Sequence, residues 1–303
     1  MKIVVTGSLG HVSKPLTQQL IKGGHSVTVI SSKADRQAVI EALGAKAAIG
    51  TMEDVDFLTS VFTGADAVYC MLASGNNIFS DPSRGVADVM VMANKIANNY
   101  VQAIQQSGVT RIVYLSTVGA HTDKGNGLLA MHNHAEHILA QLPADVSVSF
   151  MRPVGFYDNL FNFISGIKAR GVIAANYGGE DVANLVSPID IAAAIVEELT
   201  SSIVAKKARY VASDVLTCNE VATVLGDTIG LPELKWIVIS DEQQLNGLKA
   251  FGMNASFAES FVEMNAFIHS GKVYEDYNRN KPTLGKVKIK EFAKEFAVAY
   301  HQQ

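Results

Sequence analysis

The sequence predicts an α/β fold in which a doubly wound parallel sheet of the Rossmann type is followed by a smaller C-terminal α/β lobe. The chain opens with a β-branched run that leads into a glycine turn and a helix. Apolar strand-like segments then alternate with helix-like segments as far as about residue 152, where the alternation changes. Continuous apolar strands separated by helices are typical of a parallel sheet covered on both faces, and right-handed crossovers make such a sheet doubly wound.

The first expected strand, residues 2–6, is followed directly by Gly7. Gly10 comes next, and Ser13 stands where a third glycine is expected, ahead of a helix over 14–22 with proline in its first turn. Glycines let the backbone approach a phosphate group, and the free N–H groups of a helix start point at it. This pattern predicts a dinucleotide site; the alternative is a strand-to-helix turn that binds nothing.

The rest of the first half repeats the strand–helix alternation. Its strand-like runs are continuous and apolar, as expected for strands buried on both faces, although the run at 46–50 is weaker. We expect strands at 25–30, 46–50, 67–72, 111–116 and 146–151, and helices at 33–43, 54–62, 86–107 and 129–141.

The second half has no internal repeat and no low-complexity linker. A proline-led helix is expected over 188–199, a strand over 209–212, and two helices near 219–229 and 241–250. We therefore predict a nucleotide-binding domain at 1–152 and a substrate-side lobe at 153–303 that contributes to the same sheet.

Composition favours a soluble globular protein. The chain has 303 residues, 48% hydrophobic and 18% charged, with a mean hydropathy of +0.18. A net charge of −4 argues against nucleic acid or an anionic membrane as a partner. Cys70 and Cys218 make no disulfide framework, and no metal-type spacing occurs. The first strand begins at residue 2 and no apolar run has membrane-spanning length, so we expect a cytoplasmic location.

Several further stretches fit one family once the glycine loop is placed after the first strand. The Arg-Pro-x-x-Phe-x-x-Asn segment of that family is matched by Arg152, Pro153, Phe156 and Asn159. The chain resembles the NmrA-like branch of the atypical short-chain dehydrogenases/reductases, which includes NAD(P)H:quinone-reductase-like proteins. The resemblance covers nearly the whole chain and implies an NAD(P)-binding Rossmann domain. The other matching stretches are 2–13, 50–54, 64–68, 115–120, 187–192 and 226–230.

The end of the second strand bears on cofactor choice. An NAD-preferring site usually has a carboxylate there for the ribose hydroxyls, whereas this chain has Ser31, Ser32, Lys33 and, after Asp35, Arg36. Small hydroxyls and cations would bind a 2′-phosphate. We therefore favour NADP(H) over NAD(H), although the neighbouring acid weakens the argument and a solvated helix start is the alternative.

The resemblance also implies the other cofactor contacts. Those near the diphosphate are Gly7, Leu9, Gly10, His11 and Val12; near adenine, Thr51 and Met52; near the ribose, Met71, Leu72 and Ala73. Those near the nicotinamide are Ser116, Val118, His134, Pro153, Val154, Gly155 and Phe156.

Active reductases of the wider superfamily use a Tyr-x-x-x-Lys pair as acid and base. Here the lysine position matches His134 and the tyrosine position matches Ala130, so the pair is absent. The first hypothesis is hydride transfer to a quinone or another electron-poor carbonyl, assisted by His134, Ser116 or Tyr157. The second is a non-catalytic NADP(H) sensor that regulates a protein partner. A nucleotide-sugar epimerase is third, because epimerisation also needs the tyrosine base.

Side chains around these positions carry weaker expectations. We expect His132 and His137 at the surface and Glu136 on a solvated face, and we predict no metal site. An aromatic group at 156–163 could wall a pocket for a planar small-molecule substrate or form core, and only Phe156 is favoured for the pocket.

Overall fold

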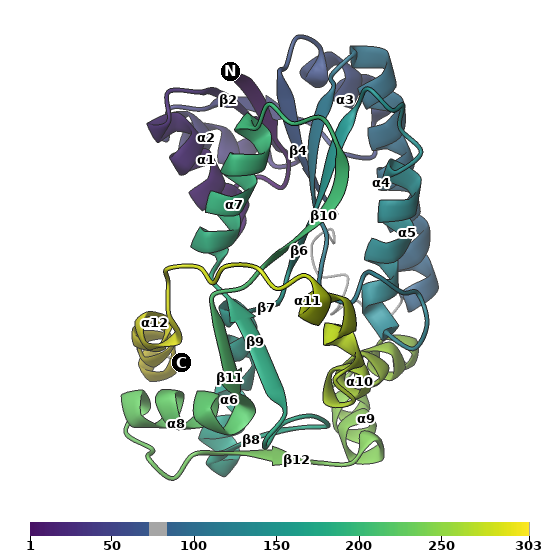
Figure 1. Cartoon of the computed structure of the whole chain (residues 1–303). Helices are drawn as coiled ribbons and strands as arrows, with labels where there is room; N and C mark the ends of the chain where they lie inside the picture. The colour runs from purple at the N-terminus through teal and green to yellow at the C-terminus, as the bar shows by residue number, and fades with distance from the viewer. Residues whose placement is uncertain (73–83, 303) are drawn as a thin grey trace.

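The computed structural model describes residues 1–72 and 84–302, and its central element there is a seven-stranded sheet whose strands all run parallel (Figure 1). The strand order is β10-β6-β5-β4-β1-β2-β3, so the order reverses between β1 and β4. Such a reversal opens a ligand crevice at the carboxyl ends of the strands. The strands are β1 (Lys2–Val5), β2 (Ser26–Ser31), β3 (Lys46–Ile49), β4 (Ala67–Met71), β5 (Arg111–Leu115), β6 (Ser147–Pro153) and β10 (Lys206–Val211).

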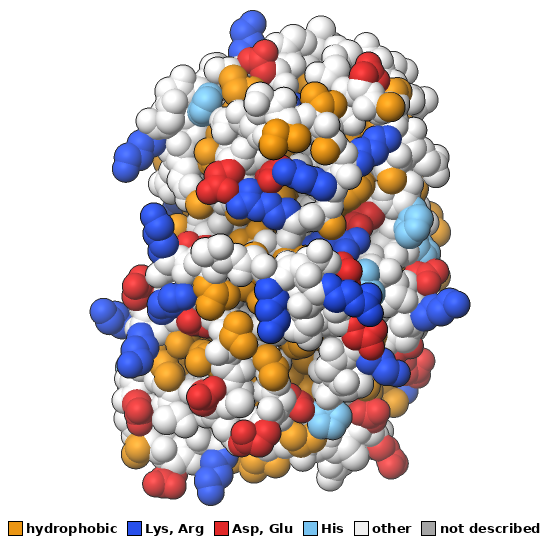
Figure 2. All heavy atoms as spheres, in the orientation of Figure 1, with side chains coloured by type: hydrophobic (Ala, Val, Ile, Leu, Met, Phe, Trp, Pro, Cys, Tyr) orange, Lys and Arg blue, Asp and Glu red, His pale blue; other side chains and the backbone are white. Residues whose placement is uncertain are grey.

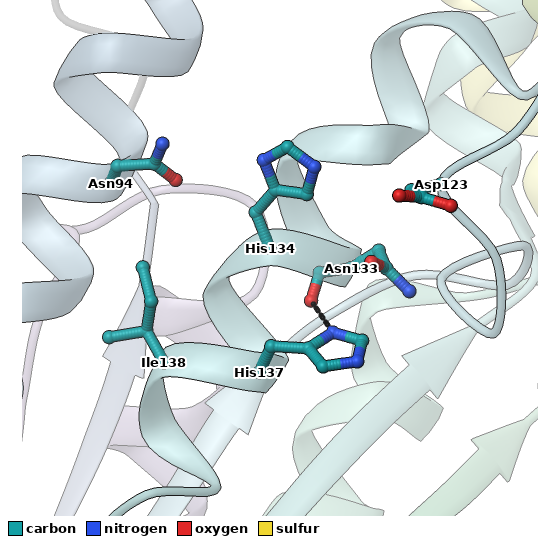
Figure 3. A pocket seen from close by; sticks show the side chains of 6 residues that line it. All are labelled: Asn94, Asp123, Asn133, His134, His137 and Ile138. Atoms are coloured by element: carbon teal, nitrogen blue, oxygen red, sulfur yellow. Dashed lines mark hydrogen bonds between the residues drawn. The ribbon is translucent and has the colours of Figure 1, made fainter.

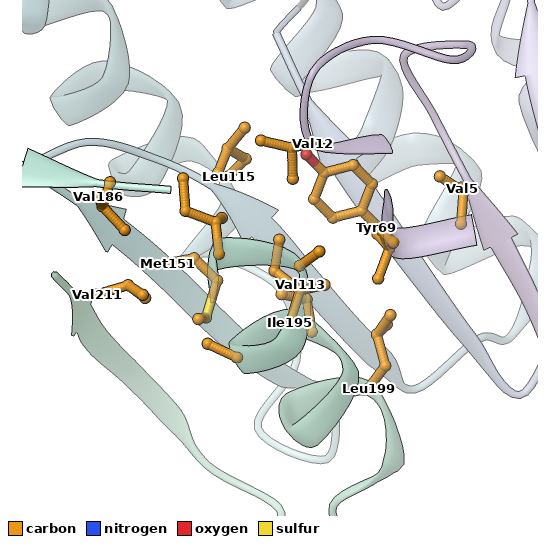
Figure 4. Packing of buried hydrophobic residues seen from close by; sticks show 14 of the residues in the cluster. Val5, Val12, Tyr69, Val113, Leu115, Met151, Val186, Ile195, Leu199 and Val211 are labelled. Atoms are coloured by element: carbon orange, nitrogen blue, oxygen red, sulfur yellow. The ribbon is translucent and has the colours of Figure 1, made fainter. Parts of the chain in front are cut away.

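Helices cover both faces of this sheet (Figure 1). Successive strand residues point to opposite faces, so Val5 and Val113 pack with Ile195 on one face (Figure 4), whereas Val4 and Tyr114 belong to the core of the other. Each fully buried aliphatic side chain contributes roughly 1.5–3 kcal/mol. The first face carries α1 (Ser13–Lys22), α2 (Gln37–Ala42) and α7 (Pro188–Thr200), and the second carries α3 (Val55–Phe62), α4 (Val86–Ser107) and α5 (Ala130–Leu139).

A smaller lobe is built beside the carboxyl edge of the sheet (Figure 1). Its own core contains Tyr157, Phe292, Phe296 and Trp236. One small sheet has the order β11-β9-β7, and another pairs β12 with β8. The strands are β7 (Gly155–Phe156), β8 (Val172–Ala175), β9 (Val182–Val186), β11 (Asp214–Thr217) and β12 (Lys235–Val238). The helices are α6 (Ile164–Arg170), α8 (Cys218–Ile229), α9 (Asp241–Ala250), α10 (Ala255–His269), α11 (Glu275–Arg279) and α12 (Ile289–Gln302), and 3₁₀ segments occur at η1 (Ala34–Arg36), η2 (Gly127–Leu129), η3 (Tyr157–Phe163) and η4 (Lys272–Tyr274).

The fold class predicted from sequence is confirmed, with differences in detail. The helix expected over 33–43 is a 3₁₀ turn followed by the short α2, and the strand expected over 209–212 is the longer edge strand β10. No element was predicted after residue 250, and β7, β8, β9, β11 and β12 were not predicted. These strands have at most five residues, and each forms only because a distant segment pairs with it.

The lobe is fastened to the sheet layers at several places. β10 and α7 come from the second half of the chain yet belong to the central sheet and its cover. The η2 turn packs so tightly on α10 that a Cβ at Gly127 would lie 2.0 Å from the Ser260 carbonyl oxygen.

Acidic and basic side chains are interspersed over the face shown in Figure 2. Among the described residues, no helix combines the length and apolar character needed to cross a bilayer.

Candidate functional site

The carboxyl ends of β1, β2, β4, β5 and β6 meet at one edge of the sheet, which faces the lobe (Figure 1). Most residues predicted to bind a dinucleotide follow these strand ends directly. The parallel topology therefore gathers segments that are far apart in sequence at one edge.

The glycine loop after β1 has a conformation that its sequence requires. Gly7 has φ +86°, and a Cβ there would lie 2.2 Å from Met71 Sδ and 2.9 Å from Ser13 Oγ. Ser8 is also left-handed, with φ +55°, and its N–H donates to the Ile30 carbonyl at 2.9 Å. The backbone is thus held in a tight turn in which a side chain at position 7 would be strained and would displace Met71.

Ser13 stands where the third glycine was expected, and the structure shows how it fits. Ser13 is 1% exposed, and its hydroxyl donates to the Thr6 carbonyl at 2.9 Å. Among described residues, the N–H groups of Leu9, His11 and Val12 have no hydrogen-bond acceptor. These N–H groups precede α1 and fit the anionic diphosphate of a dinucleotide.

The turn after β2 contains one buried serine with a structural role and two exposed cations. Ser31 is buried, and its oxygen accepts hydrogen bonds from Ser8 Oγ at 3.1 Å and from the Lys33 N–H at 3.2 Å. Ser32, Lys33 and Arg36 are exposed, and neither cation forms an ion pair with a described residue. These two side chains are therefore free to bind a phosphate at this end.

The segments predicted to flank adenine and ribose are anchored from α4. The Tyr100 hydroxyl contacts Met52 Sδ and the Met71 carbonyl, both at 2.8 Å. Thr51 is exposed, whereas Leu72 is partly buried against the core beneath α3, α4 and α5. Ala73, the remaining predicted contact here, lies outside the described residues.

The nicotinamide end is built from the extended β5–β6 ladder. The Ser116 N–H donates to the Met151 carbonyl at 2.7 Å, and the Val118 N–H donates to the Pro153 carbonyl at 2.8 Å. Val154 is buried beside them and bonds to β10. Gly155 and Phe156 form β7, and Phe156 packs against the core cluster that also contains Val118.

Side chains from α5 and β6 meet behind Ser116. The Ser116 hydroxyl donates to Glu136 Oε1 at 2.5 Å. Arg152 donates to the same carboxylate from Nε at 3.0 Å and from a terminal nitrogen at 2.6 Å. Glu136 is only 7% exposed, so the expectation of a solvated face is wrong. Burial lowers the pKa of the Arg152 guanidinium, but the hydrogen bonds and charge of Glu136 outweigh burial and hold it above its ordinary value.

The helix α5 distributes its histidines to two sides. His132 is half-buried and bonds to the Tyr114 hydroxyl at 3.0 Å, so it is less exposed than expected, and burial lowers its pKa to about 4. His134 and His137 line a pocket of about 340 Å³ with Asp123 (Figure 3). Asn94, Asn133 and Ile138 complete the lining, so His134 is the one predicted site residue there. Within the described residues, no cluster of three or more His, Cys, Asp or Glu suits a metal ion.

Tyr157 lies in the lobe core. It is 1% exposed, its ring stacks on Phe292 at 5.3 Å, and its hydroxyl donates to Asp214 at 2.6 Å. Burial, reinforced by the Asp214 carboxylate, raises the pKa of the Tyr157 phenol. This geometry argues against proton transfer by Tyr157.

The glycine loop also contacts the lobe directly. His11 Nδ1 contacts the Asp158 carboxylate of η3, and the His11 side chain is otherwise largely exposed. The roles of Asp158 and of Glu136, Tyr210 and Asp276, the partners of Arg152, were not predicted from the sequence. The spacing of 132, 136 and 139 along α5 was an available signal that Glu136 faces inward.

Comparison with known proteins matches the chain to a family model and to one curated relative over part of its length. A family model described as NAD(P)H-binding matches residues 7–202, more than half of the chain. An uncharacterised protein of Schizosaccharomyces pombe is 34% identical over 68 residues. That alignment covers 22% of this chain and 23% of the relative, so the chain matches less than two thirds of the relative's length.

Solved structures share the fold over nearly the full length. An NADPH-dependent quinone oxidoreductase from Escherichia coli, solved with NADPH, superposes with a TM-score of 0.79 at 18% identity, covering 97% of this chain and 99% of that one. A triphenylmethane reductase from Citrobacter sp. gives 0.77 at 19% identity, covering 98% and 100%. A nucleoside-diphosphate-sugar epimerase from Staphylococcus aureus gives 0.76 at 15% identity, covering 97% and 100%. At these identities the likeness establishes the fold alone.

Proposed function

The chain belongs to the NAD(P)H-binding family, and on that premise we propose that it is an NADPH-dependent reductase acting on a quinone or another electron-poor carbonyl compound. The observation that carries the proposal is a glycine loop suited to a dinucleotide, together with apolar residues and no tyrosine proton donor where the nicotinamide is predicted to bind. The Gly7 turn suits a diphosphate, as do the N–H groups of Leu9, His11 and Val12, which have no acceptor among the described residues. Bound NADPH would supply the hydride.

Cofactor preference rests on the turn after β2. Lys33 and Arg36 are exposed cations without a described ion-pair partner, and no carboxylate stands at the strand end itself. A guanidinium and an ammonium favour the doubly charged 2′-phosphate of NADP(H) over a ribose hydroxyl. We therefore propose that the chain prefers NADP(H) to NAD(H).

Acceptor class follows from the missing proton donor. Ala130 and His134 replace the tyrosine and lysine. A quinone that accepts a hydride becomes the hydroquinone anion, which then takes one proton from water. No protein acid is therefore required in the hydride step. Phe156, which packs partly buried against the core cluster that contains Val118, would supply an apolar wall for a planar acceptor. The backbone of Ser116 and Val118, bonded to β6, fixes that end of the site.

The test is NADPH oxidation against a panel of quinones, activated carbonyls and simple ketones. We expect turnover with quinones and little with simple ketones. A Lys33→Ala/Arg36→Ala variant should lose NADPH-driven turnover through a higher KM, whereas Lys294→Ala, which removes an exposed cation from α12 in the lobe, should not. NADPH binding without turnover on any acceptor would refute the reductase proposal.

The second candidate is a non-catalytic NADP(H) sensor. It is favoured by the engagement of the predicted proton donors: the Ser116 hydroxyl bonds to Glu136, and the Tyr157 hydroxyl bonds to Asp214. A sensor would bind NADPH and NADP⁺ with different effects on a protein partner. An epimerase is less well supported, because Ala130 occupies the position of the tyrosine base. Conversion of a nucleotide sugar by the purified protein would support that function instead.

The remaining features suit this proposal. Both cysteines, Cys70 and Cys218, are free and buried, which suits the reducing cytoplasm proposed for the protein. We also propose that residues 1–152 hold most of the cofactor and that residues 153–303 form the substrate side. Gly155 and Phe156 would then close the nicotinamide end from the lobe.

A further inference from the structure

The buried hydroxyl of Ser116 has its single proton already engaged. Ser116 is 3% exposed and donates to Glu136 Oε1 at 2.5 Å. A serine hydroxyl carries one proton and two acceptor lone pairs. Toward a ligand at the carboxyl end of β5, Ser116 therefore offers an acceptor and no donor.

The direction of this hydrogen bond is fixed by the residues behind it. Arg152 donates two hydrogen bonds to the Glu136 carboxylate, at 3.0 and 2.6 Å. A carboxylate paired with a guanidinium in this way accepts hydrogen bonds and donates none. Arg152 is itself held by Asp276 at 3.0 Å and by the Tyr210 hydroxyl at 3.2 Å. Tyr210 in turn donates to Asp276 at 2.6 Å. Both carboxylate oxygens of Glu136 accept from these Arg152 donors, so the Ser116 proton stays turned toward Glu136 and away from the ligand side.

Resting on the proposed binding of NADP(H), we infer that Ser116 accepts a hydrogen bond from the carboxamide N–H of the nicotinamide, and that Glu136 and Arg152 are positioning residues that keep it an acceptor. The carboxamide supplies N–H donors at this end of the dinucleotide, whereas a quinone or ketone oxygen has none. Ser116 thus orients the cofactor and leaves the oxygen of the hydride acceptor without a donor. This accounts for a preference for acceptors that need no protein acid.

The test compares two cofactors by calorimetric titration, with no turnover involved. One is NADPH, and the other is its 3-acetylpyridine analogue, in which a methyl ketone replaces the carboxamide and removes its N–H groups. We expect the wild-type chain to bind NADPH about tenfold more tightly, the equivalent of one hydrogen bond. Ser116→Ala should lose this preference by weakening NADPH alone, whereas Ser116→Thr, which keeps a hydroxyl, should retain it.

The chain offers a matched control on the same sheet. Ser149 is also buried and donates to a buried carboxylate, Glu198, at 2.7 Å, and Glu198 is paired with Arg209. Ser149 lies inside β6, away from its carboxyl end, so Ser149→Ala should leave the preference unchanged.

Glu136→Gln tests the positioning role. An amide can donate to Ser116 as well as accept from it, so the preference should fall to about threefold. An unchanged preference in Glu136→Gln would refute the role of Glu136. Equal wild-type affinities for the two cofactors, or a full preference in folded Ser116→Ala, would overturn the inference alone. No NADPH binding by the wild-type chain would overturn the proposed function and this inference with it.

Discussion

Replacing Gly7 by alanine separates the two demands that the loop makes on this position. The left-handed φ of +86° costs an alanine about 1–2 kcal/mol. The new Cβ would also lie 2.2 Å from Met71 Sδ and 2.9 Å from Ser13 Oγ, and relieving such overpacking costs about 1–3 kcal/mol. We therefore expect Gly7→Ala to lower the free energy of unfolding by roughly 2–5 kcal/mol.

Gly24→Ala is the matched control. Gly24 has a similar φ of +79° but nothing within 4 Å of an added Cβ, so it should lose only the backbone cost of about 1–2 kcal/mol. Urea unfolding gives both values, provided that the slope is unchanged. NADPH titration should show at least about tenfold weaker binding for Gly7→Ala, an effect of about 1.4 kcal/mol, and no change for Gly24→Ala. Equal losses of stability at the two glycines would refute the packing argument.

Three further predictions concern the two cations after β2, the imidazole of His132 and the phenol of Tyr157. Lys33→Ala/Arg36→Ala should weaken NADPH binding about tenfold or more while changing NADH binding less than about twofold, and a parallel loss for both cofactors would contradict the phosphate assignment. Burial lowers the pKa of His132 to about 4, so the folded chain holds the ring neutral while the unfolded chain binds a proton below about pH 6.5. The free energy of unfolding should therefore fall by about 1–3 kcal/mol as the pH is lowered from about 6.5 to about 4. A His132→Gln variant with the same pH dependence of stability would exclude this cause. Tyr157→Phe should cost about 1–3 kcal/mol of stability in urea unfolding by removing a donor to Asp214, and a fall in kcat of the folded variant would return the phenol to the catalytic candidates.

The fold was largely predictable because its signals are local. Each central strand is a continuous apolar run, and the proline at the first turn of α7 marks a helix start. The Gly7 turn, its left-handed backbone and the following helix belong to one short stretch. Short-range sterics and turn chemistry act within a few residues, so the sequence displays them directly.

The lobe was less predictable because its strands depend on partners far along the chain. β7 has two residues and exists through pairing with β9. The aromatic stretch after it divides between adjacent residues: Phe156 joins the core of the central sheet, whereas Tyr157 joins the core of the lobe. Composition gives the same prediction for both, and only the direction of each side chain separates them.

By itself, the sequence determined a nucleotide-binding α/β fold, a family resemblance and the absence of the tyrosine–lysine pair. Only the tertiary structure decided which polar groups remain available at the site. It turned Glu136 inward onto Ser116 and Arg152, and it placed His134 in a pocket on the side of α4. The spacing along α5 could place Glu136 on the inward face, but its pairing with Ser116 and Arg152 depends on contacts between α5, β5 and β6 that the order of residues along one helix does not show.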